Sequence, residues 1–407
     1  MKKTIRDIAV ANKVVFVRVD FNVPIKEGII KDDNRIVQAL PTIRYLVNAK
    51  AKVVLLSHLG KVDHKNPENT ENDKKKNNMA PVAIALKKLL GEKINVAFTP
   101  VAVGSEVNSA VSLLKGGDVL LLQNTRFEKG EEKNDLTLAK AWADLADAFV
   151  MDAFGSAHRA HASTYGIPSL LKERGKDTAL GFLVEKEVLA LSKCVSNVER
   201  PYVAILGGAK VSDKIKVIEV LLDKVDVLII GGGMSYTFAK AQGFKIGTSL
   251  LDEAQIDFAK NCLEKGKGKL LLPIDRIIAN DFSNPSQVRE DSAADIPDDF
   301  MGLDIGPKTR TLFANALKGA KTVFWNGPMG VFEDSRYDKG TIAICEAIAN
   351  LKGAFTVIGG GDSAAATAQF GFYDKFSHVS TGGGASLEMI ENEGHLPGID
   401  VIEEKNA

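Results

Sequence analysis

Short apolar runs recur along the chain, and longer stretches of mixed polarity separate them. Each run is continuous rather than alternating, which is typical of strands that are covered on both faces of a sheet. The stretches between the runs space their apolar residues as amphipathic helices do, for example over 81–90, 136–145 and 215–222. This alternation predicts an α/β fold with parallel sheets covered by helices on both faces. The predicted strands are 14–19, 53–56, 119–122, 148–151, 203–206, 227–230, 270–272, 322–325 and 355–358.

A helical stripe near the middle of the chain marks a domain boundary. Apolar residues fall at positions 184, 188, 191, 195 and 198, and Arg200-Pro201 predicts the end of the helix because a residue before proline avoids the α region. A chain of 407 residues has the length of two domains. We therefore expect a first domain over 1–182, a connector helix over 183–200 and a second domain over 201–393. A separate segment, 62–78, is almost wholly polar and predicts an exposed, mobile loop.

Charge distinguishes the two halves. The whole chain has 52 basic and 52 acidic side chains, a balance that argues against binding to nucleic acid or to a membrane surface by bulk charge. Residues 1–182 carry a net charge of +7 and residues 183–407 carry −7. Glycine is also uneven, since 11 of 36 glycines lie before residue 183. The two halves are therefore expected to have different tasks.

The three cysteines, Cys194, Cys262 and Cys345, are far apart and odd in number, which favours small core residues in a reducing compartment. The N-terminus has no apolar signal region, and the chain has no run of 18 apolar residues. These features predict a soluble cytoplasmic protein that spans no membrane.

Glycine triplets follow several second-half strands. Gly359-Gly360-Gly361-Asp362-Ser363 precedes the predicted helix 364–370, where Ser363 is expected to be the N-cap. Similar loops occur at 231–233 and 381–386. Glycine lets backbone N–H groups approach a phosphate at a helix N-terminus, so three such loops favour a nucleotide site over ordinary turns. The Walker A sequence and G-x-G-x-x-G are both missing from the contexts they require, which disfavours P-loop and NAD-binding folds.

Basic side chains dominate the first-half loops that follow strands. Arginine binds phosphate and carboxylate with two parallel hydrogen bonds, so a cluster of these residues at one sheet edge predicts a pocket for a small anion bearing both groups. Two of the histidines, His158 and His161, rank lower because capping or core roles are alternatives for them. His64, His378 and His395 are interpreted as structural or incidental. The candidate residues are Arg35, His58, Lys61, Arg126, His158, Arg159 and His161.

A basic pocket in one half and glycine loops in the other together outline a kinase for a small phosphorylated metabolite. An NAD-dependent dehydrogenase would also combine glycine loops with a substrate domain, but it would need the G-x-G-x-x-G fingerprint. A non-catalytic nucleotide sensor would need the glycine-rich half without the basic pocket. Both alternatives stay open at this point.

Nine motifs, in order along nearly the whole chain, resemble those of the phosphoglycerate kinase family. The first-half motifs lie at 17–24 (VRVDFNVP), 57–60 (SHLG), 124–127 (NTRF) and 152–161 (DAFGSAHRAH). The second-half motifs lie at 206–214 (LGGAKVSDK), 302–307 (GLDIGP), 325–333 (WNGPMGVFE), 360–363 (GGDS) and 380–385 (STGGGA).

The resemblance implies two similar Rossmann-like domains joined by a hinge, acting as a monomer, with a C-terminal peptide over 394–407 that returns to the N-terminal domain. It also implies the glycolytic reaction in which a phosphoryl group moves reversibly between 1,3-bisphosphoglycerate plus ADP and 3-phosphoglycerate plus MgATP. The partners would be these small molecules, and the cofactor would be Mg²⁺.

The resemblance also assigns roles to individual residues. Arg35, Lys210, Gly361 and Gly384 would act on the transferred group, and Asp362 would meet Mg²⁺. The residues for 3-phosphoglycerate would be Asp20, Phe21, Asn22, Arg35, His58, Leu59, Gly60, Lys61, Arg126 and Arg159. The residues for the nucleotide would be Lys210, Lys214, Gly302, Glu333, Gly360, Gly361, Asp362 and Ser363. One departure is Lys61-Val62, where the family usually has Arg-Pro, because lysine lacks the two-pronged geometry of arginine.

This reaction places few demands on acid–base chemistry. In the ATP-consuming direction the nucleophile is a carboxylate, which is already ionised at neutral pH, so no general base is needed. Catalysis is then expected to rest on positioning and on electrostatic stabilisation of the transferring phosphoryl group. Domain closure about the connector would exclude water from the acyl phosphate.

Overall fold

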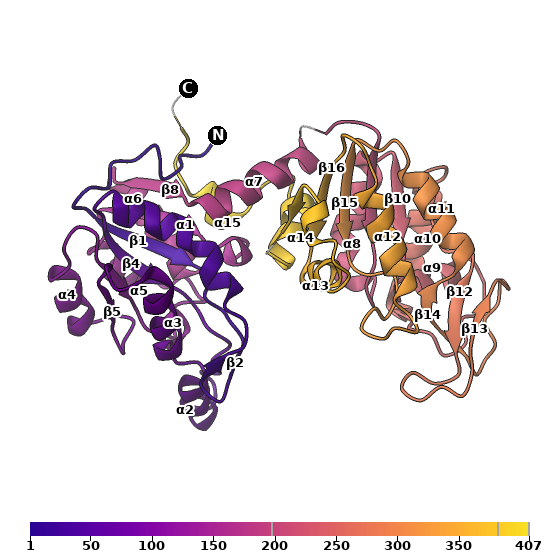
Figure 1. The fold of residues 1–407 in the computed structure, drawn as a ribbon, viewed down its shortest axis with the longest axis horizontal. Helices are drawn as coiled ribbons and strands as arrows, with labels where there is room; N and C mark the ends of the chain where they lie inside the picture. Colours follow the sequence, from indigo (N-terminus) through magenta and orange to yellow (C-terminus); the bar gives the residue numbers. More distant parts are fainter. Residues whose placement is uncertain (197, 381, 406–407) are drawn as a thin grey trace. The chain divides into compact units, whose positions relative to one another are not determined.

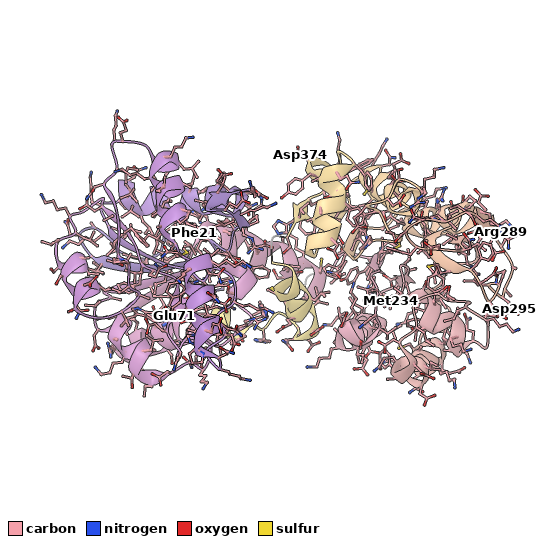
Figure 2. All side chains as sticks on the ribbon, turned by 90° about the horizontal axis from the view of Figure 1, so that it is seen from below. Phe21, Glu71, Met234, Arg289, Asp295 and Asp374 are labelled. Atoms are coloured by element: carbon pink, nitrogen blue, oxygen red, sulfur yellow. The ribbon has the colours of Figure 1, made fainter. Side chains whose placement is uncertain are left out.

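The computed structural model describes residues 1–196, 198–380 and 382–405. The chain divides into two compact units, and the division falls within one helix, α7 (Phe182–Val195). Unit 1 contains residues 1–188 and 395–407, and unit 2 contains residues 189–394. Phe21 and Met234 are buried within their units, whereas Glu71, Arg289, Asp295 and Asp374 lie on the surface (Figure 2).

Unit 1 is built on a six-stranded sheet in the order β5-β6-β4-β1-β7-β8, with every pair parallel. A small antiparallel hairpin, β2 (Ile25–Lys26) with β3 (Ile29–Ile30), follows β1. The sheet strands are β1 (Val14–Val19), β4 (Lys52–Leu56), β5 (Val96–Phe98), β6 (Val119–Leu121), β7 (Ala148–Asp152) and β8 (Asp177–Leu180). The helices are α1 (Asn34–Asn48), α2 (Pro67–Lys76), α3 (Ala80–Leu90), α4 (Ser105–Ser112), α5 (Leu136–Ala143), α6 (Ile167–Glu173) and α15 (Pro397–Asp400), with α7 shared by both units.

Unit 2 repeats this plan with a parallel sheet in the order β11-β10-β9-β15-β16-β17. A second, antiparallel sheet has the order β13-β12-β14. The strands are β9 (Tyr202–Leu206), β10 (Val227–Ile230), β11 (Leu270–Leu271), β12 (Arg276–Ala279), β13 (Val288–Asp291), β14 (Met301–Ile305), β15 (Thr322–Asn326), β16 (Phe355–Gly359) and β17 (His378–Val379). The helices are α8 (Ile215–Lys224), α9 (Ser235–Ala241), α10 (Ile256–Lys265), α11 (Pro307–Leu317), α12 (Lys339–Ala349), α13 (Gly361–Gln369) and α14 (Gly384–Glu391).

The predicted α/β class is confirmed, because both large sheets are parallel and flanked by helices (Figure 1). All nine predicted strands are present with ends within one residue. Their side chains are buried because the helices cover the sheets, as the continuous apolar runs require. In unit 1, for example, Val17 of β1 packs in one core cluster with Ile43 of α1 and Leu86 of α3.

The polar segment 62–78 was predicted as a loop, and this was wrong. It contains the ten-residue helix α2, of which no residue is buried. Asn66 caps this helix by accepting hydrogen bonds from the backbone N–H groups of Glu68 and Asn69, at 3.0 and 3.2 Å, and Pro67 occupies its first position. The N-cap residue and the proline at the first position thus favour a helix here, although this helix has no apolar face.

The helix predicted over 183–200 is shorter than expected, since α7 ends at Val195. The hydroxyl of Ser196 shares the carbonyl of Ser192 with its own backbone N–H, at 3.3 and 2.9 Å, and this competition favours the end of a helix. Asn197, within the predicted connector, lies outside the described residues, as do Asn406 and Ala407 of the predicted C-terminal peptide.

The last part of the described chain packs on unit 1. The backbone N–H of Gly398 donates to Ala157, and that of Lys3 donates to Glu403, both at 2.8 Å. The ammonium of Lys2 lies 2.7 Å from the carboxylate of Glu404. These contacts tie the beginning of the chain to residues 395–405.

Candidate functional site

A polar pocket of about 600 Å³ opens in unit 1 beside the carboxyl ends of β1, β4 and β7. Parallel strands bring the loops that follow them to one edge of the sheet, where ligands of α/β proteins bind. Six of the seven basic side chains named from the sequence line it directly, all except Arg35, and they do so together with neighbouring polar groups. The lining residues are Asn22, His58, Lys61, Val62, Asp63, Asp73, Arg126, Glu132, Gly155, Ser156, His158, Arg159 and His161.

Arg126 is held by the short 3₁₀ helix Thr125–Phe127. The Asn124 side chain caps this turn by accepting from the backbone N–H of Arg126 at 3.0 Å. The guanidinium donates to the carbonyl of Gly60 at 2.6 Å and lies 3.3 Å from the carboxylate of Glu132. Burial lowers the pKa of Arg126, but an arginine remains charged at neutral pH. The group is a fixed positive charge with donors left for an anion.

His58 is oriented by a buried arginine that the sequence analysis did not select. The Nη2 group of Arg18 lies 3.1 Å from Nδ1 of His58, and its Nε donates to the hydroxyl of Ser163 at 2.8 Å. That hydroxyl in turn donates to the carboxylate of Glu131, which is also buried. Since a guanidinium only donates, Nδ1 of His58 must be the acceptor.

Burial and the nearby charge of Arg18 lower the pKa of His58 well below its usual range, so the ring is neutral at pH 7. The proton of the neutral ring therefore lies on Nε2. His58 can donate one directed hydrogen bond into the pocket without adding a charge.

Asp20 and Arg35 form an ion pair next to this pocket, with 2.5 Å between Oδ2 and Nη1. Burial favours a neutral Asp20, but His58, Arg35 and Arg18 together outweigh it and lower the pKa of this carboxyl. Arg35 was predicted in a loop that follows a strand, and this was wrong, because it lies in the first turn of α1. Neither residue lines the pocket itself.

The remaining predicted residues of unit 1 differ in what they expose. The side chains of Phe21 and Leu59 are buried in the core, so only their backbone can face a ligand. Asn22 accepts from the backbone N–H of Gly60 at 2.8 Å, which joins two loops of the pocket. Lys61 and Arg159 are exposed.

Of the two histidines with several interpretations, His161 is an N-cap residue and also lines the pocket. Its backbone N–H donates to the hydroxyl of Thr164 at 3.0 Å. Burial, together with the nearby positive charge of Arg18, lowers the pKa of His161 to about 4. The ring is therefore neutral at pH 7, and its N-cap position and its burial agree with both the capping and the core interpretation. His158 accepts from Nε of Arg159 at 3.1 Å.

A second polar pocket, of about 350 Å³, opens in unit 2 at the carboxyl ends of β9, β15 and β16. Two helices, α13 and α14, begin at this pocket, and the first residues of both line it. Their unpaired backbone N–H groups and dipoles attract a negative group. The lining residues are Gly208, Ala209, Lys210, Asp213, Lys214, Asn326, Gly327, Gly360, Gly361, Asp362, Ser363, Gly383, Gly384 and Leu387.

The turn into α13 requires glycine at position 360. Gly360 has a φ of +98°, and a Cβ there would lie 2.7 Å from Nδ2 of Asn326. Asn326 uses this nitrogen to donate to the carbonyl of Gly359 at 2.8 Å. Ser363, predicted as the N-cap, lies inside the helix instead, and its hydroxyl accepts from the backbone N–H of Gly327 at 2.6 Å. The prediction was wrong because Gly360 already provides the cap position, which leaves the hydroxyl to join two pocket loops.

The two lysines of this pocket are in different states. Nζ of Lys214 is buried and donates to the carbonyls of Gly207 and Asn326 at 2.5 and 3.0 Å. Burial lowers the pKa of Lys214 to about 8, although Asp362 and Asp213 oppose the shift. Lys210 is exposed, and within the described residues it makes no hydrogen bond or ion pair. Lys210 is thus a cation that lines the pocket and has no partner among the described residues.

Asp362 and Asp213 are the carboxylates that line the pocket, and both are exposed. Mg²⁺ prefers oxygen ligands and is commonly held by one or two carboxylates together with substrate phosphates. The exposed carboxylate of Asp362, in a pocket where two helices begin, fits this requirement.

Two predicted nucleotide residues lie outside the set that lines this pocket. Gly302 is on β14, where a Cβ would overlap the hydroxyl of Tyr236, and Glu333 is an exposed residue of the segment that follows β15. Thr381 of the second glycine loop lies outside the described residues. The structure therefore brings together the predicted phosphate residues, and it leaves Gly302 and Glu333 apart from them.

Comparisons with known proteins give one consistent result. The family model described as "Phosphoglycerate kinase" matches residues 5–393. The phosphoglycerate kinase of Enterococcus faecalis is 55% identical over 408 residues, which are 99% of this chain and 100% of that protein. That of Macrococcus caseolyticus is 54% identical over the full length of both. The structure of phosphoglycerate kinase from Coxiella burnetii is similar with a TM-score of 0.87 and 40% identity, and that from Pyrococcus horikoshii with 0.81 and 32%, each over 98% of both chains.

Proposed function

The chain belongs to the phosphoglycerate kinase family and is a kinase of glycolysis that transfers phosphate to a carboxylate, and from this premise we propose how its two pockets share the reaction. The unit 1 pocket binds 3-phosphoglycerate or the 1,3-bisphosphoglycerate formed from it. The unit 2 pocket binds the phosphates of ATP or ADP. The observation that supports this assignment is the difference between the two pockets. Basic side chains line the pocket of unit 1, whereas the N-termini of two helices line the pocket of unit 2.

In unit 1, the fixed guanidinium of Arg126 provides the main charge for the anionic substrate. Arg159 and Lys61 add exposed positive charges at the same pocket. The neutral ring of His58 adds a directed donor, because Arg18 occupies its other nitrogen. Asn22 links two of the pocket loops through Gly60. Charge and direction together favour a substrate that carries both a phosphate and a carboxylate.

In unit 2, backbone N–H groups at Gly361 and Gly384 meet the nucleotide phosphates, and Lys210 adds the mobile charge. Lys214 holds the loops of the pocket through two carbonyls and lies next to the same phosphates. Gly302 and Glu333 are assigned to the base and ribose, outside the phosphate pocket. Asp362 would hold Mg²⁺, which supplies positive charge that offsets the negative charge of the phosphates.

In the ATP-consuming direction, a carboxylate oxygen of 3-phosphoglycerate attacks the γ-phosphorus of ATP. A new P–O bond forms, and the bond from the γ-phosphorus to the bridging β-oxygen breaks, which leaves ADP. No proton moves, so no general base is required. Arg35, Lys210 and the N–H groups of Gly361 and Gly384 stabilise the charge of the phosphoryl group during transfer.

We propose that the transfer takes place when the two units close on both bound substrates, with motion about α7. An acyl phosphate reacts readily with water, so closure would protect it while bringing the carboxylate within reach of phosphorus. The buried state of all three free cysteines fits a reducing compartment such as the cytoplasm. No helix of the described chain has the length and apolar character of a membrane span. We further propose that the enzyme acts as a monomer.

Calorimetric titration of the full chain tests the assignment of the two pockets. We expect Arg126→Gln to weaken binding of 3-phosphoglycerate by about tenfold or more, the scale of a lost charge-assisted hydrogen bond, and to leave MgADP binding unchanged. Lys210→Gln is expected to do the reverse. Lys216→Gln, an exposed lysine outside the pocket, is the matched control. A variant that weakens both ligands equally, or neither, would contradict the assignment.

A further inference from the structure

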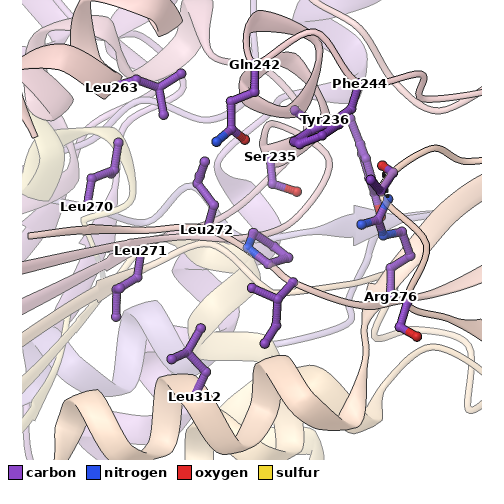
Figure 3. A pocket seen from close by; sticks show the side chains of 15 residues that line it. Ser235, Tyr236, Gln242, Phe244, Leu263, Leu270, Leu271, Leu272, Arg276 and Leu312 are labelled. Carbon is purple, nitrogen blue, oxygen red and sulfur yellow. Dashed lines mark hydrogen bonds between the residues drawn. The ribbon is translucent and has the colours of Figure 1, made fainter. Parts of the chain in front are cut away.

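A third pocket, of about 500 Å³, lies in unit 2 between α9, α10 and α11 and the strands β11 and β12 (Figure 3). None of its lining residues lines the phosphate pocket. Its volume falls in the range of sites for small organic molecules. The assignment of the phosphate pocket therefore does not explain what this third pocket binds.

One side of this pocket is apolar. In the view of Figure 3, Leu263, Leu270 and Leu271 lie at one end and Leu312 lies below them. Each of these leucines is only partly buried, and Ile274 at the rim is 51% exposed. Covering these exposed apolar side chains with an apolar part of a ligand would be favourable, because it removes apolar surface from water.

The other end of the pocket holds Arg276, beside Tyr236 and Phe244 in the same view (Figure 3). Arg276 is only 9% exposed, yet the one hydrogen bond that it makes to the described residues, to the carbonyl of Ala294, is 3.5 Å long. Within the described chain, no carboxylate lies within 4 Å of its guanidinium, and this includes Asp291, its register partner on β13.

A guanidinium has five N–H donors, and a single long hydrogen bond to a neutral carbonyl leaves most of these donors and the charge uncompensated. Arg276 therefore has donors and charge to offer at the polar end of an otherwise apolar cavity. An anionic group placed there would supply the missing acceptors, and two parallel hydrogen bonds are within reach of a carboxylate or sulfonate.

We propose that this pocket binds a small amphipathic anion, with an apolar ring system or chain between the leucines and its acidic group on Arg276. Its lining shares no residue with the pocket of unit 1 or with the phosphate pocket of unit 2. Ser235 and Ala239 of the helix α9 line this pocket. Ala239 is a small residue on the lining, so a larger side chain there would occupy the cavity itself.

Two fluorescent probes test the proposal on the full chain. 8-Anilinonaphthalene-1-sulfonate has the proposed chemistry, and N-phenyl-1-naphthylamine has the same rings without the sulfonate. We expect Arg276→Gln to raise the Kd of the sulfonate probe about tenfold, the effect of one charge-assisted contact, and to leave the neutral probe within twofold. Ala239→Phe is expected to weaken both probes by filling the cavity.

Arg289→Gln is the matched control, since Arg289 is an exposed arginine on the same antiparallel sheet outside the pocket. It should leave both probes unchanged. Circular dichroism establishes that each variant is folded, and Ala239→Phe decides the location if Arg276→Gln does not fold. The proposal is overturned if a folded variant, Arg276→Gln or Ala239→Phe, leaves the Kd of the sulfonate probe unchanged. It is equally overturned if MgADP displaces that probe competitively.

Discussion

Replacing Arg35 with alanine removes a charge that we assign to the moving phosphoryl group. Arg35 lies in the first turn of α1, and its guanidinium is paired with Asp20 at 2.5 Å. The side chain of Arg35 is 42% exposed, so loss of this pair is expected to cost at most about 1 kcal/mol of folding free energy. The variant should therefore fold normally, and a change in rate can be attributed to the reaction.

The expected kinetic effect is much larger than the effect on stability. Removing one donor that acts on charge in a transition state costs about 10²–10³ in kcat, or about 2.7–4 kcal/mol. The KM for 3-phosphoglycerate should also rise, because Arg35→Ala leaves the carboxylate of Asp20 uncompensated near the pocket. Arg35→Lys keeps the charge but loses the planar fork, so its kcat should fall between those of Arg35→Ala and the native chain.

Steady-state rates are measured with saturating MgATP and varied 3-phosphoglycerate. Arg44→Ala is the matched control, since Arg44 is an exposed arginine on the same helix that donates only to the carbonyl of Leu89. A kcat for Arg35→Ala within about threefold of the native value would refute the reasoning, because a contact to charge in the transition state is expected to contribute about 10²–10³ to kcat. Equal losses for Arg35→Ala and Arg44→Ala would point to a general effect on α1 instead.

Three further predictions concern binding and pH. Lys61→Arg should lower the KM for 3-phosphoglycerate, since a guanidinium adds a second prong at the pocket, and an unchanged or higher KM would argue that Lys61 is not a ligand. Burial lowers the pKa of Lys214 to about 8, so this lysine loses its charge as the pH rises, and the KM for MgADP should increase from about pH 7 to about pH 9. Lys214→Gln should remove this pH dependence of the KM. A pH dependence that persists in Lys214→Gln would contradict the prediction. Burial raises the pKa of Asp152 to about 7, so between about pH 4 and pH 7 the folded chain holds a proton that the unfolded chain releases. The urea midpoint of the native chain relative to Asp152→Asn should therefore rise as the pH is lowered from about 8 to about 5, and a difference independent of pH would exclude this account.

The parallel sheets could be predicted because their central strands are buried on both faces and are therefore continuously apolar, as over Val14–Val19. The edge strands β5, β8 and β17 were missed, since they are short and lack a distinct apolar run. The antiparallel sheet of unit 2 was missed for a related reason, because β13 is largely exposed and polar. The hydrophobic pattern of a segment reflects how deeply its side chains are buried. These strands instead form because they pair with strands that are distant in the sequence, and the local pattern does not show that pairing.

The site residues divide in the same way. Loops after strands could be assigned to a pocket because parallel topology brings them together, whereas Arg35 reaches its partner from a helix. Arg18 was not selected, although a charged residue inside the apolar strand Val14–Val19 is itself a signal that a buried partner must exist. The partners of Arg18, Ser163 and Glu131, carry no such signal, since only the fold brings them beside His58.

The most direct test of the account is phosphoryl transfer from MgATP to 3-phosphoglycerate by the purified chain. Glyceraldehyde-3-phosphate dehydrogenase and NADH report the 1,3-bisphosphoglycerate that forms, so transfer appears as a loss of NADH absorbance. We predict NADH oxidation that requires both substrates and falls about 10²-fold or more in Arg35→Ala. No NADH oxidation by freshly prepared, folded protein would contradict the account.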